Sequence, residues 1–255
     1  MIVELRVFVL ACLSRLVVVL LALGFALLFP AYDSSTRLVS NHSLSALANW
    51  DGVHFLDVAQ SGTQRFEHSF AFFPGFPLLV RLVSDWLHLD LVMAGVLVAN
   101  VCFVLAALVL LQIANEKTVW LFLLSPANIF FSSVYSESLF ALLVFLGCFF
   151  LARKKPLSAT AAFFACSAVR SNGAVFALLL LIRKEVVLAG VIGIPFLLHN
   201  FRCFVEFCVY MDERDWCSKV CCFVLFCFVL FCFVLFLFFF CFCFCFCFCF
   251  FFLFS

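Results

Sequence analysis

A short polar cluster near residue 50 has the residue types that general acid–base chemistry needs. Trp50-Asp51-Gly52-Val53-His54-Phe55 predicts a helix that starts near Asp51, and the spacing of three places His54 on the same face as Asp51. A carboxylate in that position can act as a general base that accepts the proton of an attacking hydroxyl group. Trp50 and His54 are then candidate substrate-binding residues beside it. The alternative is that Asp51 caps the helix N-terminus, which is a common role of Asp.

A second cluster combines Glu67 and His68, both candidate substrate-binding residues, with an aromatic segment broken by two prolines. We call residues 69–77, Ser-Phe-Ala-Phe-Phe-Pro-Gly-Phe-Pro, the aromatic ledge. Aromatic side chains are enriched at membrane–water interfaces, which favours an interfacial anchor. A groove for a lipid tail is the other interpretation, and the spacing alone does not decide between them.

Three further polar residues lie between apolar runs: Glu137, Arg170 and Asn172. A guanidinium group matches the geometry of a phosphate, so Arg170 is a candidate ligand of a phospholipid or polyprenyl phosphate, with Glu137 and Asn172 as neighbouring binding residues. A structural salt bridge between Arg170 and Glu137 is the alternative. Asn41-His42-Ser43 is a glycosylation sequon, which predicts that Asn41 lies on the noncytoplasmic side.

The composition predicts an all-α polytopic membrane protein. Hydrophobic residues make up 68% of the 255 residues, charged residues only 11%, and the mean hydropathy is +1.29, far from the composition of soluble domains. A net charge of +1 and the lack of a basic stripe argue against nucleic-acid binding. We therefore expect lipids or lipid-linked molecules as partners. Nine of the 16 cysteines fall between Cys221 and Cys249, and none has zinc-site spacing, so no metal site is expected.

Apolar runs define the expected helices. The first span is predicted at 7–29, and a polar loop follows at about 31–86. A secretory signal peptide is the alternative for the first span, but the apolar run is long and lacks a small-x-small cleavage site. Arg15 either reaches toward the headgroups, which its position favours, or faces the protein interior. The later apolar runs are 91–113, 118–132, 138–152, 157–169, 173–182 and 186–204.

Lysine and arginine clusters predict how these runs are oriented. Loops rich in Lys and Arg are usually cytoplasmic. If the basic clusters lie in the cytoplasm, then 118–152 and 157–182 form two hairpins whose tips lie on the side of Asp51. The other interpretation makes 157–182 one ordinary span.

The last 36 residues, 220–255, contain only Phe, Cys, Val and Leu apart from a terminal Ser. All four residue types have codons close to a run of thymines, so a translated intron or truncated gene model is the favoured interpretation of this biased segment. A genuine additional span is the alternative, because the segment exceeds the roughly 20 apolar residues that cross a bilayer. We therefore divide the chain into a membrane domain, 1–219, and this tail.

Several motifs in the first 217 residues together resemble a known family. They are Ser14-Arg15, the cluster around Asp51, Phe66 to Pro77, Ser125-Pro126-Ala127-Asn128-Ile129-Phe130-Phe131, Tyr135-Ser136-Glu137-Ser138-Leu139-Phe140 and Val169-Arg170-Ser171-Asn172-Gly173. In type, order and spacing they are similar to those of the GPI mannosyltransferase 2 family, which adds the second mannose during GPI-anchor assembly.

The resemblance implies a GT-C-type enzyme of the endoplasmic-reticulum membrane with a lumenal active site. Such an enzyme transfers mannose from dolichyl-phosphate mannose to the 6-position of the first mannose of a GPI precursor, without a cofactor or a required metal. The family's acidic residue in the first lumenal loop corresponds to Asp51, and a small membrane-protein subunit is a further candidate partner. After residue 217 the sequence departs from the family. An inactive truncated fragment is therefore one alternative. A small membrane transporter with a polar site at the bilayer midplane is the other.

Overall fold

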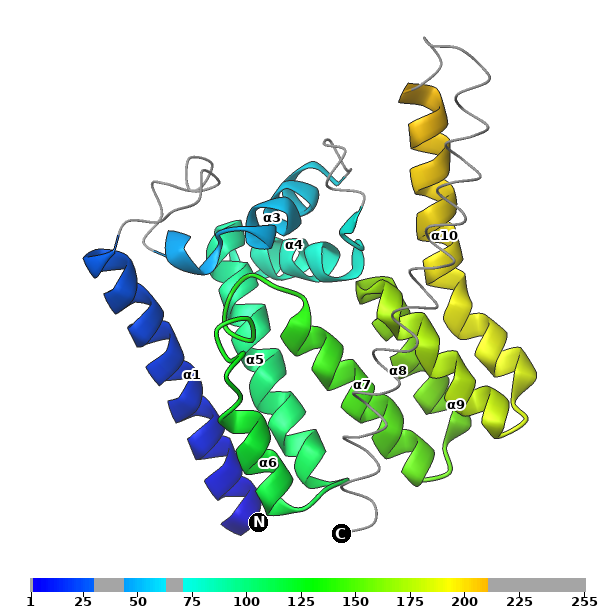
Figure 1. Ribbon diagram of the computed structural model, residues 1–255, viewed down its shortest axis with the longest axis horizontal. Coiled ribbons are helices and arrows are strands. Elements are labelled where there is room, and N and C mark those ends of the chain that lie inside the picture. The colour runs from blue at the N-terminus through cyan, green and yellow to red at the C-terminus, as the bar shows by residue number, and fades with distance from the viewer. Residues whose placement is uncertain (1, 30–43, 63–70, 211–255) are drawn as a thin grey trace.

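The computed structural model describes residues 2–29, 44–62 and 71–210, and this part of the chain is helical without any β-strand (Figure 1). The expected all-α membrane fold is confirmed: α1, α5 and residues Val186–Cys203 of α10 are each long and apolar enough to cross a bilayer. The elements are α1 (Ile2–Leu28), η1 (Ser45–Leu47), α3 (Asp51–Ser61), α4 (Gly75–Leu87), α5 (Leu91–Leu111), α6 (Glu116–Leu123), α7 (Glu137–Ala152), α8 (Pro156–Val169), η3 (Ser171–Phe176), α9 (Ala177–Ile182) and α10 (Val186–Tyr210).

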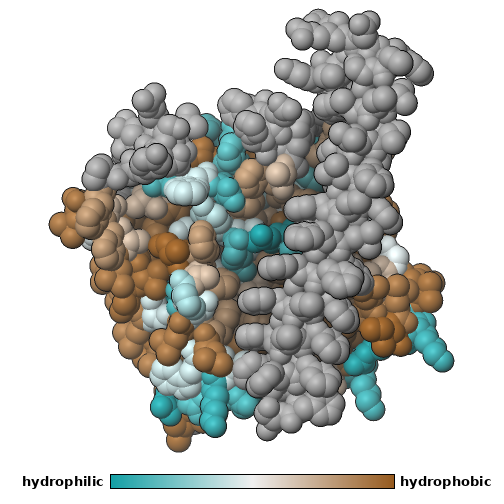
Figure 2. Space-filling view, in the orientation of Figure 1, coloured by the Kyte–Doolittle hydropathy of each residue, from teal (hydrophilic) through white to brown (hydrophobic). Residues whose placement is uncertain are grey.

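The long helices run side by side, and α3 and α4 lie across their upper end in Figure 1. The turns that join α6 to α7 and α8 to α9 lie at this same end, as the charge pattern predicts. The basic clusters at 153–155 and 183–184 are exposed and follow the lower ends of α7 and α9. In Figure 2, hydrophilic side chains gather along the lower edge, while hydrophobic surface covers the side formed by α1. Both hairpin tips therefore share an end of the bundle with Asp51.

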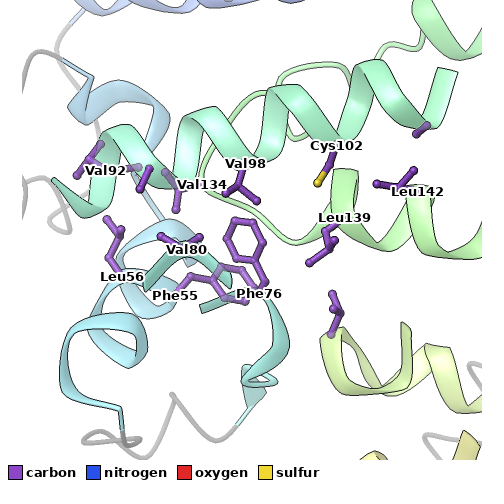
Figure 3. Close-up of a cluster of buried hydrophobic side chains, with 14 residues drawn as sticks. Phe55, Leu56, Phe76, Val80, Val92, Val98, Cys102, Val134, Leu139 and Leu142 are labelled. Atoms are coloured by element: carbon purple, nitrogen blue, oxygen red, sulfur yellow. The ribbon is translucent and has the colours of Figure 1, made fainter. Parts of the chain in front are cut away.

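A core of apolar side chains holds α3 and α4 on the bundle (Figure 3). Phe55 of α3 and Phe76 of α4 point toward Val98 of α5, and their rings meet edge to face with centroids 5.3 Å apart. Val134, from the turn before α7, enters the same core. A Cβ atom at Gly95 of α5 would lie 2.7 Å from Val134 Cγ1, so only glycine permits this contact. The core therefore joins α3, α4, α5 and the 124–136 turn into one unit.

Two predicted apolar arms are shorter than expected. The run at 118–132 is not one helix: α6 ends at Leu123, and turns occupy 124–136. Pro126 disfavours a helical conformation at Ser125, and the Asn128 side chain donates to the Leu123 carbonyl oxygen (2.6 Å), which satisfies a helix-terminal acceptor. The run at 173–182 begins within the 3₁₀ helix η3 and continues as the short α9.

Of the two interpretations of Arg15, the favoured one, that it reaches the headgroups, is wrong, and the alternative, that it faces the protein interior, is confirmed. Its side chain is only 4% exposed and faces the interior of the protein. The guanidinium finds hydrogen-bond acceptors at Asn128 and Ser132, which lie in the run 118–132 that the sequence pattern had assigned to an apolar helix. Interior acceptors therefore replace the headgroups.

The contact between α7 and α8 yields a stability prediction. A Cβ atom at Gly147 would lie 2.2 Å from the ring of Phe163, which is fully buried and stacked on Phe176. Gly147→Ala is expected to lower the free energy of unfolding by about 1–3 kcal/mol through overpacking. Gly190→Ala is the matched control, because nothing lies within 4 Å of that position on α10. Thermal unfolding in detergent measures both, and equal midpoints for the two variants would contradict the packing of α7 on α8.

Candidate active site

The chain makes a strained turn immediately before Asp51. Trp50 has φ 59° and ψ −124°, and the Gly52 N–H donates to the Asn49 carbonyl oxygen over 3.1 Å. This is the geometry of a type II′ turn, in which glycine normally occupies the position of Trp50. Such a conformation costs a non-glycine residue about 1–3 kcal/mol and is concentrated at functional sites. The turn directs the chain into α3 with Asp51 as its first residue.

Asp51 is exposed at the N-terminus of α3, where the helix begins as the sequence predicts. The residue at the N-cap position is Trp50, and α3 has no side-chain cap. Within the described residues the Asp51 carboxylate makes no hydrogen bond or ion pair. The carboxylate is therefore available to accept a proton.

In the described part of the aromatic ledge, residues 71–77, the aromatic rings pack against other parts of the protein. His54 stacks on Phe72 with ring centroids 5.0 Å apart, and Phe73 and Phe76 are buried. The predictions of an interfacial anchor or a lipid-tail groove are therefore wrong for these rings, because α3 and α10 cover them. Glu67 and His68 lie outside the described residues, as do Asn41 and the tail 220–255.

Glu137 and Arg170 form an ion pair between the start of α7 and the end of α8. The Arg170 Nη1 group donates to Glu137 Oε1, and the guanidinium carbon lies 5.8 Å from the ring centroid of Phe140. The structural salt bridge considered for these two residues is thus formed. Among the described residues, the other N–H groups of Arg170 make no hydrogen bond, and the side chain is partly exposed. The pair can therefore present the rest of the guanidinium to an anion.

Asn172 follows two residues later, within η3. It is half-buried, and its Oδ1 accepts a hydrogen bond from the Ser171 hydroxyl over 3.5 Å. This places the side-chain amide close in sequence to Arg170 at the same hairpin tip.

Two glycines of the motifs set the position of Arg170. A Cβ atom at Gly75 would lie 2.6 Å from the Ala168 carbonyl oxygen, and one at Gly173 would lie 2.4 Å from the backbone of Cys166. The start of α4 and the 3₁₀ helix η3 therefore both contact the last turn of α8. This close approach of backbones explains why glycine occupies both motifs.

The segment 133–137 links the Asp51 turn to the Arg170 pair. The Val134 N–H donates to the Leu47 carbonyl oxygen (2.8 Å), and the Tyr135 hydroxyl donates to the Asn49 carbonyl oxygen (3.3 Å). Glu137, at the end of the segment, binds Arg170. Residues that are more than 80 positions apart in sequence are thus held at one end of the bundle.

Sequence reasoning missed His199. This residue is buried in α10, its ring centroid lies 4.0 Å from that of Phe73, and its Nε2 lies 3.5 Å from Cys203 Sγ. An ionisable residue within the apolar run 186–204 was the available signal, because such residues in membrane spans are usually functional or paired. In the described part of the chain, no group of three or more His, Cys, Asp or Glu side chains is placed to hold a metal ion.

These features define a multi-pass α-helical membrane protein with a carboxylate, a guanidinium and aromatic residues gathered at one end. The chain belongs to the Mannosyltransferase (PIG-V) family, whose model matches residues 2–184. No solved structure matches the chain.

Curated relatives carry related names. The chain is 31% identical over 186 residues to GPI mannosyltransferase 2 of Cryptococcus neoformans, covering 66% of this chain and 43% of that protein. It is 36% identical over 153 residues to human GPI alpha-1,6-mannosyltransferase 2, covering 52% of this chain and 30% of the human protein. The match to GPI mannosyltransferase 2 of Yarrowia lipolytica is 30% over 236 residues, covering 80% of this chain and 65% of that protein. The chain thus spans less than half of the length of the Cryptococcus and human relatives.

The strain at Trp50 can be measured by comparing two substitutions that both remove the indole. Trp50→Gly is expected to be more stable than Trp50→Ala by about 1 kcal/mol, since glycine adopts positive φ without steric cost. Thermal unfolding midpoints of the two variants give the difference. A Trp50→Ala variant as stable as Trp50→Gly would show that the turn is not strained.

Proposed function

We propose that this chain carries part of the active site of an endoplasmic-reticulum mannosyltransferase that acts on lipid-linked substrates. The donor is dolichyl-phosphate mannose, and the acceptor is the first mannose of a GPI precursor, which is extended through an α-1,6 linkage. The names of the relatives support this assignment. The observation that carries it is the 133–137 segment, which holds the Asp51 turn and the Glu137–Arg170 pair at one end of the bundle.

Asp51 acts as the general base in this proposal. The 6-hydroxyl oxygen of the acceptor attacks C1 of the donor mannose, and the hydroxyl proton moves to the Asp51 carboxylate. The bond between C1 and the phosphate oxygen breaks, and its electron pair leaves with dolichyl phosphate. A β-linked donor gives an α-linked product, so one displacement suffices and no covalent enzyme intermediate forms. Asp51 is exposed and its carboxylate does not cap α3, so it suits this role.

Arg170 stabilises the phosphate of the donor. The leaving group gains negative charge as the bond to C1 breaks, so a preorganised cation lowers the barrier. Glu137 holds one arm of the guanidinium and leaves its other N–H groups for phosphate oxygens. Trp50, His54 and Asn172, with Glu67 and His68, are the proposed substrate contacts around these two groups.

The site lies on the lumenal side in this proposal. The basic clusters at 153–155 and 183–184 are at the opposite end of the bundle from α3, and positive charge favours the cytoplasm. Glycosylation at Asn41 would agree with this orientation. A small membrane-protein subunit is a further proposed partner. An inactive fragment is the second candidate, and the partial coverage of the relatives fits it.

Replacing Asp51 by Asn separates the base from a structural role. Asp51→Asn is expected to lower the rate of mannose transfer by about 10² to 10⁴-fold, because the amide cannot accept the proton. Asp90→Asn is the control: Asp90 Oδ1 accepts from the Met93 N–H at the start of α5, and Asn caps helices as well as Asp. The measurement is the two-mannose GPI intermediate in microsomes of cells lacking this activity, at matched protein level. Parental activity in Asp51→Asn would remove Asp51 from the mechanism, and no product from the parental chain would favour the inactive fragment.

Arg170→Lys keeps the charge but loses the planar fork. We expect the KM for dolichyl-phosphate mannose to rise about tenfold or more while protein abundance stays unchanged, because charge-assisted hydrogen bonds are lost. Arg153→Lys, at the other end of the bundle, serves as the control and should leave KM unchanged. If Arg170→Lys lowers abundance but not donor affinity, the ion pair with Glu137 is structural only.

A further inference from the structure

Arg15 is a buried cation in the middle of α1 that the proposed chemistry does not use. Its Nη1 group donates to the Asn128 carbonyl oxygen (3.1 Å) and to the Ser132 hydroxyl (3.0 Å), and its Nη2 group donates to the Ser14 hydroxyl (3.0 Å). The guanidinium carbon lies 3.6 Å from the ring centroid of Phe103. No carboxylate among the described residues forms a salt bridge with Arg15, so hydroxyl and carbonyl oxygens and the ring of Phe103 solvate this charge.

The hydrogen bonds of Arg15 continue into α5. The Ser132 hydroxyl donates to Asn100 Oδ1 (2.9 Å), and Asn100 Nδ2 donates to the carbonyl oxygens of Ser132 (3.2 Å) and Val96 (2.7 Å). The Ser14 hydroxyl donates to the Leu123 carbonyl oxygen (3.2 Å), where α6 ends. Ser132 thus receives bonds from α1 and α5 at once, which fixes the backbone of the 124–136 turn between the two helices.

Residues 124–136 need this network because they are not helical. Buried backbone N–H and C=O groups that make no helical hydrogen bond must find partners elsewhere in the protein. Near the end of the segment, Val134 and Tyr135 contact the residues around the Asp51 turn. The next helix begins with Glu137, which binds Arg170. Lysine could not replace Arg15, since an ammonium group has no planar face to stack on Phe103 while its N–H groups bind three separate oxygens.

We infer that Arg15 is a positioning residue: it holds the 124–136 segment so that Val134 and Tyr135 fix the Asp51 turn and Glu137 orients Arg170. The catalytic consequence rests on the proposed mannosyl transfer, but the positional claim does not. On the positional claim, loss of the Arg15 side chain moves Val134 away from the start of α3.

A disulfide reports this position without any assay of activity. An ideal Cβ at Gly52 lies 3.7 Å from Val134 Cβ, within the Cβ separation of about 3.5–4.5 Å that disulfides adopt. The full chain with Gly52→Cys and Val134→Cys should therefore form this bond rapidly on mild oxidation, measured as the linked peptide by mass spectrometry. With Arg15→Leu added, formation should slow at least about threefold, because the required geometry is no longer held.

Leu16→Ala is the matched control, because its side chain lies beside Arg15 on α1 but is 54% exposed. Ser132→Ala removes only the acceptor in the turn and should slow the disulfide in the same direction. The Ser132→Ala variant therefore tests the same claim if the Arg15→Leu protein does not accumulate. Equal rates of disulfide formation in the Arg15→Leu, Ser132→Ala and Leu16→Ala backgrounds would overturn the positional claim, whatever the chain catalyses.

Kinetics test the second half of the inference in the chain without added cysteines. Arg15→Leu and Arg15→Lys should lower kcat about tenfold or more at matched abundance, since small misplacements of catalytic groups are costly. The KM for the donor should change less, because Arg170 is also held by the last turn of α8. A slowed disulfide with parental kcat would limit Arg15 to a structural role and overturn its catalytic one. Absence of transfer by the parental chain would count against the proposed function alone, since the disulfide result stands by itself.

Discussion

The 124–136 turn is not helical, so its buried backbone N–H and C=O groups must find hydrogen-bond partners elsewhere in the protein. Arg15 and Asn100 do this from the two helices that flank the turn, and Asn128 bonds back to the end of α6. The packing of the upper end depends on this arrangement. Val134 enters the core against Gly95, and Tyr135 reaches the Asn49 carbonyl oxygen. A turn displaced by a few ångströms would lose both contacts.

The last turn of α8 is the second fixed point of the site. Gly75 and Gly173 each bring a different segment within contact distance of its backbone, at separations that no other residue type allows. Arg170 follows this turn directly, and Glu137 constrains its side chain from α7. The cation is therefore positioned by backbone packing on one helix and by an ion pair to another. This matters for a charge-stabilising group, since a preorganised cation needs no rearrangement as the charge on a phosphate develops.

The sequence predicted those parts of the fold that depend on local patterns of apolar and charged residues. Apolar runs and basic clusters predicted the helices and placed both hairpin tips at the end that carries α3, and the Trp50 to Phe55 pattern predicted where α3 begins. It failed where the outcome depended on which distant groups meet. Arg15 could bond to headgroups or to interior acceptors, and the run 118–132 gave no sign that it would turn and supply those acceptors. Likewise, the exposed or buried state of Phe73 depends on α10, more than 100 residues later.

The two halves of the candidate site differ in how they are constrained, and this difference fits their proposed roles. The Asp51 carboxylate has no side-chain partner among the described residues and follows a strained turn, so the structure stabilises its position through the backbone and leaves its oxygens open. Arg170 is held by a partner side chain that occupies one of its arms. A base must exchange a proton in each turnover, and a bound partner on its oxygens would compete with that exchange. A charge-stabilising group exchanges nothing, so a permanent partner improves its orientation at little cost. The asymmetry between a free carboxylate and a paired guanidinium therefore suits the proposed single-displacement transfer from a phosphate-linked sugar.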